Sequence, residues 1–131
     1  MRSVTISAVY SPRLLDHFEH PRNAGDANHP DASVQVENPV CGDILQLSLK
    51  VADGHISEIR FRCKGCVPAL ACASALTEMV KGRTLEAARR LRQEELVDFV
   101  GGLPEASSHA GHLAIDALAA VLKEFSVKQR P

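Results

Sequence analysis

The chain has 131 residues, of which 45% are hydrophobic and 24% charged, and its formal net charge is −1. This length supports one domain with a hydrophobic core over residues 1–131, and it is too short for two. A near-neutral chain lacks the basic surface that phosphate binding requires, so we expect no nucleic-acid partner. No apolar run approaches the roughly 18 residues that cross a membrane. With no secretory signal recognisable at the start, we predict a cytoplasmic protein with reduced cysteines.

The N-terminal third of the chain predicts one helix and little other regular structure. Residues 1–10 show no pattern and are predicted to be flexible. The Ser-Pro pair at 11–12 is typical of a helix start, and we expect that helix to end near Pro21. Residues 22–39 are rich in Asn, Asp, Pro and Gly. They predict a loop with one short strand at 33–37.

Alternating apolar residues predict a β-hairpin in the middle of the chain. Leucines alternate with polar residues over 45–51, and the same period-two pattern recurs over 58–63. Asp53 and Gly54 stand between the two runs and are typical turn residues. One face of this hairpin is therefore expected to be buried.

Helical patterns fill the rest of the chain. One helix is expected to begin after Cys66, with one apolar face, and to end at Gly82. Thr84 is a predicted cap for a short second helix, and 93–100 predicts a third. A last helix is predicted over 108–125, with a buried stripe formed by Ala114, Leu118, Val121, Leu122 and Phe125. Strands followed by helices indicate an α+β fold.

Thiols, a carboxylate and imidazoles stand at the joints between these elements, and such side chains bind soft or borderline metals. Gly42 relaxes the backbone between Cys41 and Asp43, so both can point toward one place. The alternative for Cys41 is a buried structural cysteine beside a capping aspartate. Cys66 precedes a helix, whose N-terminal N–H groups stabilise a thiolate, so a reactive or metal-bound thiol is expected there.

The two remaining cysteines are predicted to have structural roles. Cys63 and Cys66 form a Cys-x-x-Cys sequence that suggests a chelating or redox pair. However, Cys63 shares its strand face with Phe61, so we expect it to point into the core. Cys72 falls on the apolar face of its helix, on a different side from Cys66.

Histidines occur as one pair and four isolated residues. His109 and His112 are three residues apart and share a face if the segment is helical, so the pair suits either a ligand role or a solvated helix start. The others are predicted to lie at the surface without a role: His17, His20, His29 and His55.

Short motifs in a fixed order cover nearly the whole chain. They stand at residues 10–12, 16–23, 25, 38–43, 61–66, 73–82, 109 and 113–117. Together they resemble the U-type iron–sulfur cluster assembly scaffolds, the IscU and NifU N-terminal domain family. The resemblance implies the family's two-layer sandwich, a short antiparallel β-sheet packed against α-helices, in agreement with the periodicity.

The resemblance also implies a function and a set of ligands. The family's site corresponds to Cys41, Asp43, Cys66 and His109 in this sequence. It would hold a transient 2Fe–2S cluster or iron, and zinc in the purified form, with no enzymatic activity of its own. The implied partners are a cysteine desulfurase, which supplies sulfur as a persulfide, and apo iron–sulfur proteins, which receive the cluster.

The chain departs from the family pattern at one ligand and in one recognition segment. The family has a cysteine after the histidine, where this chain has Ala110. Residues 103–107 retain little of the family's chaperone-recognition stretch, so the resemblance does not extend to an Hsp70-type chaperone partner. Candidate substitutes for the missing ligand are Cys63, Cys72 and His112.

Three functions follow from these observations. The first is a scaffold with an altered ligand set, and the second is a regulatory paralogue that binds Zn or Fe(II) but assembles nothing. The third is a thiol–disulfide oxidoreductase that uses Cys63 and Cys66, which lacks the parallel βαβ surroundings of such pairs. The sequence is compatible with a homo-oligomer.

Overall fold

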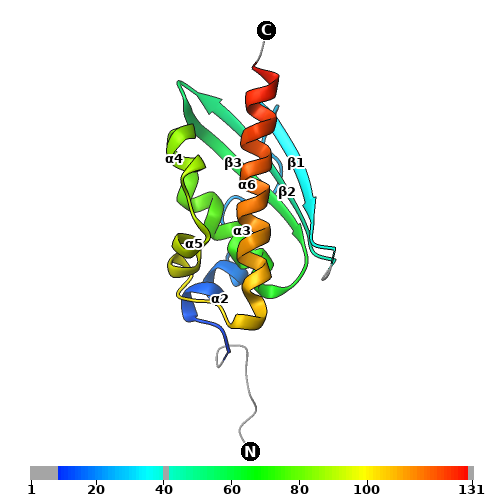
Figure 1. The fold of residues 1–131 in the computed structure, drawn as a ribbon, viewed down its shortest axis with the longest axis vertical. Coiled ribbons are helices and arrows are strands. Elements are labelled where there is room, and N and C mark those ends of the chain that lie inside the picture. Colours follow the sequence, from blue (N-terminus) through cyan, green and yellow to red (C-terminus); the bar gives the residue numbers. More distant parts are fainter. Residues whose placement is uncertain (1–8, 40–41, 130–131) are drawn as a thin grey trace, which may run out of the picture.

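The structure is a computed structural model that describes residues 9–39 and 42–129. Cys41 and most of the segment predicted to be flexible lie outside the described residues. The regular elements are α2 (Pro12–Glu19), β1 (Ala32–Glu37), β2 (Ile44–Ala52), β3 (His55–Lys64), α3 (Val67–Val80), α4 (Leu85–Arg89), α5 (Gln93–Phe99), the 3-10 helix η1 (Glu105–Ser107) and α6 (Ser108–Lys128). Figure 1 shows their arrangement.

The three strands form one antiparallel sheet in the order β1-β2-β3. The predicted hairpin is confirmed as β2 and β3, with Leu47 paired to Phe61. Asp53 and Gly54 make its turn with φ values of 54° and 75°. A two-residue type I′ turn requires such left-handed values at both central positions. The strand predicted at 33–37 is confirmed as β1.

Helices cover the inner face of this sheet (Figure 1), with α6 against β1 and β2 and α3 against β3. That face is apolar because alternate residues of a strand point to the same side. Its buried side chains include Leu45, Leu47, Leu49, Ile59 and Phe61. The predicted α+β two-layer architecture is therefore confirmed.

The helix after Cys66 is more buried than its pattern predicts. Ten of the fourteen residues of α3 are buried, so it does not have the single apolar face expected from the sequence. The physical reason is its position, since α3 packs against α2, α5, α6 and β3. Small residues dominate its sequence and let these neighbours approach closely.

Helix α2 corrects one prediction. The prediction that His17 lies at the surface is wrong, because the residue is only 2% exposed. Its Nδ1 lies 2.8 Å from Ser74 Oγ and its Nε2 lies 3.3 Å from Glu78 Oε1. The ring also lies 5.9 Å from that of Phe99. His17 follows the buried Leu14 by three residues, so both lie on the side of α2 that packs on α3.

The loop predicted over 22–39 contains an unexpected contact with the sheet. The Gly25 N–H donates to the Phe61 carbonyl at 2.8 Å, and the Phe61 N–H donates to the Asn23 carbonyl at 3.0 Å. Residues 23–25 thus lie along the edge of β3 that β2 does not cover. A short run without alternation carries no strand signal, which explains why the sequence did not indicate this pairing.

The last helix begins where predicted and runs three residues beyond the predicted end. Phe125, expected in its buried stripe, is only half-buried, whereas the other four members are buried. The short helix η1 before it was not indicated by the sequence. Within the described parts of the chain, no helix is long and apolar enough to cross a membrane.

Candidate metal centre

Three segments that are far apart in the sequence meet at one end of the sandwich. Asp43 lies in the loop before β2, Cys66 is the N-cap residue of α3, and His109 lies in the first turn of α6. This is the lower end of the molecule in Figure 1. The antiparallel hairpin brings the loop before β2 beside the end of β3, because Ile44 pairs with Lys64.

The donor atoms of these three residues form a compact group. Cys66 Sγ lies 3.2 Å from Asp43 Oδ2 and 3.6 Å from His109 Nε2. His109 Nε2 lies 3.5 Å from Asp43 Oδ2. One donor atom from each residue therefore lies within 4.8 Å of the other two. A sulfur, a nitrogen and an oxygen at such separations match the ligands of zinc and ferrous iron sites.

Asp43 is the most enclosed of the three side chains, with a residue exposure of 4%. Its Oδ1 accepts a hydrogen bond from the Cys66 N–H at 3.2 Å, while its Oδ2 faces the thiol. Gly42 has a φ of 73°, as expected of a residue that lets the loop turn sharply before Asp43. The carboxylate is thus oriented before any metal binds.

The Asp43 carboxylate leaves no room for a side chain at residue 65, so this position requires glycine. A Cβ atom on Gly65 would lie 2.6 Å from Asp43 Oδ1 and 2.7 Å from its Cγ. By itself, a glycine at position 65 indicates only a tight turn. Its contact with Asp43 depends on the pairing of β2 with β3, and no sequence signal revealed it.

The pKa of the Cys66 thiol is raised, whereas its position before a helix led us to expect a stabilised thiolate. Burial raises the pKa of the Cys66 thiol, and the Asp43 carboxylate raises that pKa further through a hydrogen bond and its negative charge. The Ala69 N–H in the first turn of α3 lowers the pKa, as expected at a helix N-terminus. Burial and the carboxylate outweigh this helix contribution, so the free thiol is held protonated and donates to Asp43.

The other described cysteines are enclosed. Cys63 is half-buried on the core face of β3 and Cys72 is buried in α3, as predicted. Burial raises the pKa of each thiol to about 12. A thiol-disulfide exchange site requires an accessible thiolate, so this environment does not favour the oxidoreductase hypothesis.

We therefore expect unequal alkylation of the cysteines. At pH 8 a thiol of pKa 12 is about one ten-thousandth ionised, so Cys63 and Cys72 should react more than tenfold more slowly with iodoacetamide than Cys66. Timed alkylation of the native protein followed by peptide mass spectrometry measures each position separately. A rapid and reversible Cys63–Cys66 disulfide would contradict this prediction.

The predicted site residues separate into distinct environments. The group of donor atoms contains Asp43, Cys66 and His109, and it does not include Cys63, Cys72 or His112. His112 shares a side of α6 with His109, as predicted, but it is exposed. Ala110 is only 1% exposed and belongs to the apolar core.

A cavity of about 220 Å³ adjoins the group of donor atoms. His109, His112, Leu113 and Asp116 of α6 form one wall, and residues 36–39 form the other. His109 therefore lies between the donor group and this cavity. The contribution of Asp116 was not indicated by any sequence signal, because it depends on how α6 lies beside the end of β1.

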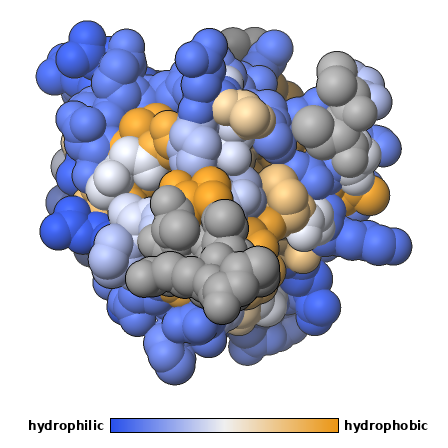
Figure 2. Space-filling model, turned by 90° about the horizontal axis from the view of Figure 1, so that it is seen from below, coloured by the Kyte–Doolittle hydropathy of each residue, from blue (hydrophilic) through white to orange (hydrophobic). Residues whose placement is uncertain are grey.

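Figure 2 views the molecule from this end. Hydrophobic side chains gather near the centre of the face, and hydrophilic ones surround them. A cavity of about 450 Å³ also lies here, between the start of α2 and the loop before η1; its lining residues are Val9, Tyr10, Ser11, Gly101, Gly102, Leu103 and Pro104. The end of the molecule that carries the donor group thus also offers apolar surface.

Comparison with known proteins agrees with the fold. A family model described as the NifU-like N terminal domain matches residues 9–131. The chain belongs to this family. Its resemblance to the IscU and NifU scaffolds, inferred from the motifs, is confirmed.

Relatives of this NifU-like domain carry scaffold names. It is 39% identical over 117 residues to the iron-sulfur cluster assembly scaffold protein IscU 1 of Archaeoglobus fulgidus, covering 89% of this chain and 76% of the relative. It is 36% identical over 125 residues to the iron-sulfur cluster assembly scaffold protein IscU of Escherichia coli K12, covering 92% and 97%.

Solved structures show the same fold. A nitrogen-fixing NifU-like N-terminal protein from Brucella abortus superposes with a TM-score of 0.74 at 25% identity, covering 94% of this chain and 98% of the other. A putative SUF-system scaffold protein from Fervidobacterium islandicum superposes with a TM-score of 0.73 at 16% identity, covering 90% and 99%. At this lower identity the likeness concerns the fold alone.

Proposed function

We propose that this NifU-like domain is an iron–sulfur assembly scaffold that holds iron or a 2Fe–2S cluster and releases it to apoproteins. The observation that carries the proposal is the convergence of Asp43, Cys66 and His109 donor atoms within 4.8 Å of one another. Cys41, two residues before Asp43, is the proposed fourth ligand. Thiolate and imidazole ligands suit iron–sulfur clusters and zinc, so zinc is the expected ion in the purified protein.

The contacts of Cys66 suggest how the site accepts its cargo. A metal binds the thiolate, so loading must remove the thiol proton. Asp43 Oδ2 accepts a hydrogen bond from that thiol at 3.2 Å, so a bound metal would take the place of the thiol proton beside the carboxylate and the proton would leave to solvent. The His109 side chain is 28% exposed, which leaves one side of the donor group open to solvent. A partly open shell is consistent with cargo that must leave again.

The proposed partners follow from the chemistry of the cargo. Inorganic sulfur is supplied in cells as an enzyme-bound persulfide, so the proposal requires a cysteine desulfurase as donor and apo iron–sulfur proteins as acceptors. The domain itself is not proposed to catalyse a reaction. The apolar surface at the same end (Figure 2) is a suitable place for these contacts. Residues 103–107 give no support for an Hsp70-type chaperone partner.

Ala110 supports a second candidate function. An alanine can neither carry sulfur nor ligate a metal, so Cys41 and Cys66 are the two thiols proposed at the site. With Asp43 and His109 they would complete a tetrahedral shell of the kind that closes structural zinc sites. This candidate is a regulatory paralogue that holds one Zn or Fe(II) ion and assembles no cluster.

Anaerobic reconstitution with ferrous iron and sulfide tests the proposal. We expect the wild-type protein to gain the visible absorption of a bound cluster and to transfer it to an apo-ferredoxin. His109→Ala should lower the retained iron about tenfold, since it removes a ligand. His112→Ala is the matched control, because His112 lies one turn away on α6 outside the donor group, and it should retain the wild-type iron content.

The outcomes separate the two candidates. A wild-type protein that retains no iron and shows no cluster absorption would reject the scaffold function. One tightly held divalent ion without transfer to apo-ferredoxin would support the regulatory paralogue. Ala110→Cys, reconstituted in parallel, tests the missing thiol directly. A cluster that forms only in this variant would show that the natural chain is not a conventional scaffold.

A further inference from the structure

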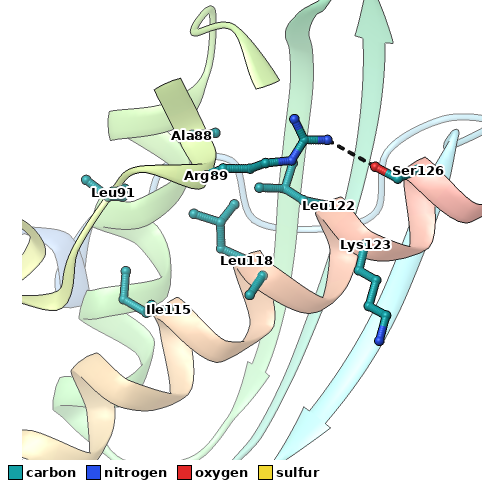
Figure 3. Close-up of a pocket in the computed structure, with 9 residues that line it drawn as sticks. Ala88, Arg89, Leu91, Ile115, Leu118, Leu122, Lys123 and Ser126 are labelled. Atoms are coloured by element: carbon teal, nitrogen blue, oxygen red, sulfur yellow. Dashed lines mark hydrogen bonds between the residues drawn. The ribbon is translucent and has the colours of Figure 1, made fainter. Parts of the chain in front are cut away.

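A third cavity lies between α4 and α6, and none of the three donor residues lines it (Figure 3). Its volume is about 390 Å³, which is within the usual range for small-molecule sites. The lining residues are Ala88, Arg89, Leu91, Ile115, Leu118, Ala119, Leu122, Lys123 and Ser126. The α6 members recur every three or four residues and so form one stripe along the helix.

The cavity exists because small residues stand where larger ones would fill it. Ala88 of α4 is buried at the edge of the core, and Ala119 of α6 is exposed. The side chains of Leu91, Leu118 and Leu122 are buried and make an apolar floor. No carboxylate stands among the residues that line the cavity.

Arg89 supplies the charge at the cavity. In Figure 3 its side chain extends past Leu122 toward Ser126, and Nη2 donates to Ser126 Oγ at 3.0 Å. Within the described residues no carboxylate oxygen lies within 4.0 Å of its guanidinium. The neighbouring Arg90, in contrast, is paired with Glu86. Lys123 also lines the cavity, but its side chain extends away from Arg89 (Figure 3), so the guanidinium is the cation that lies beside Leu122 and Ser126.

We infer that this cavity binds a small amphiphilic carboxylate, with its apolar chain on the leucine floor and its carboxylate on Arg89. A guanidinium presents paired N–H donors that match the two oxygens of a carboxylate. Exchanging a neutral hydroxyl acceptor for a carboxylate places an ionised acceptor opposite the ionised guanidinium and so adds a charge–charge attraction to the hydrogen bond. The inference is independent of the metal centre and of the proposed scaffold function.

Titration of the isotope-labelled protein, followed by ¹H–¹⁵N spectra, tests this inference. Octanoate is the probe, and octylammonium is the matched cation with the same chain. We expect octanoate to shift the amide signals around Ala88, Leu118 and Ala119, and to bind at least about tenfold more tightly than octylammonium. Arg89→Gln should remove this preference. Arg90→Gln, which removes the same charge one residue away, should leave it unchanged.

A second variant tests the cavity itself. Ala119→Leu should abolish octanoate binding by filling the space, and it should fold normally because position 119 is exposed and leucine favours helices. Equal binding of octanoate and octylammonium, absence of localised shifts, or unchanged binding in Ala119→Leu would overturn the inference. The same signals should not move when the protein is diluted in the absence of a probe. If they did, a second copy of the chain would occupy the cavity, and the inference would be overturned.

Discussion

Replacing Gly65 by alanine is expected to lower the affinity for iron or zinc by about 10–100-fold, a typical loss when the residues supporting a metal ligand are changed. The added Cβ would lie 2.6 Å from Asp43 Oδ1, a distance that real Cβ contacts do not adopt. Asp43 is buried against this residue, so its carboxylate must move away from Cys66 and His109. Overpacking should also lower the free energy of unfolding by about 1–3 kcal/mol.

Gly111→Ala is the matched control for this substitution. Its Cβ would lie 3.2 Å from Gln93 Cγ, which belongs to a half-buried but long side chain that can shift by a few tenths of an ångström. Metal affinity should therefore stay at the wild-type level. Competition against a chromogenic chelator measures the affinity of each variant, and chemical unfolding measures its stability. A Gly65→Ala protein that binds metal as tightly as the wild type would show that Asp43 is not a ligand.

Acid is expected to destabilise the fold through His17. Burial lowers the pKa of His17 from its ordinary value of 6.5, and the positive charge of Arg22 lowers that pKa further, against the opposing carboxylates of Glu78 and Asp16. The unfolded chain therefore takes up a proton near pH 6.5 while the folded chain does not. The contribution of His17 to stability is complete above pH 6.5 and is lost as the pH falls below it, by up to about 1.4 kcal/mol per pH unit.

Chemical unfolding of the protein between pH 7.5 and pH 5 measures this effect. His17→Gln should lower the stability at neutral pH, because it alters the contacts of the buried ring to Ser74 and Glu78, and it should flatten the pH dependence. His20→Gln is the matched control, since His20 is exposed at the end of the same helix, and it should keep the wild-type slope. A slope that persists unchanged in His17→Gln would assign the acid sensitivity to other groups.

The elements that the sequence predicted well are those with a regular local pattern. The hairpin followed from alternating leucines and from Asp53-Gly54, whose left-handed backbone the turn requires. The helix starts at Ser11 and Thr84 were also predicted, because each side chain accepts a hydrogen bond from a nearby N–H of its own helix. These signals are local, so they can be recognised without knowing how the rest of the chain folds.

The predictions that failed concern contacts between elements. His17 was placed at the surface because α2 alone does not reveal which side α3 covers. The pKa of Cys66 rises because the thiol is partly buried and because Asp43, 23 residues earlier, lies against it. The contact between Gly65 and Asp43 depends likewise on the strand pairing, which brings the two residues together across the sheet.

The sequence by itself determined the α+β class, most element positions and the family of this domain. Hydrophobic periodicity, helix-capping residues and short motifs each depend only on residues that are close together in the sequence. It also identified Asp43, Cys66 and His109 as candidate ligands through the motifs that contain them. Only the tertiary structure decided that their donor atoms meet within 4.8 Å and that Ala110 is buried in the core. Packing brings together residues that are distant along the chain, and it sets the burial and the neighbouring charges that control their chemistry.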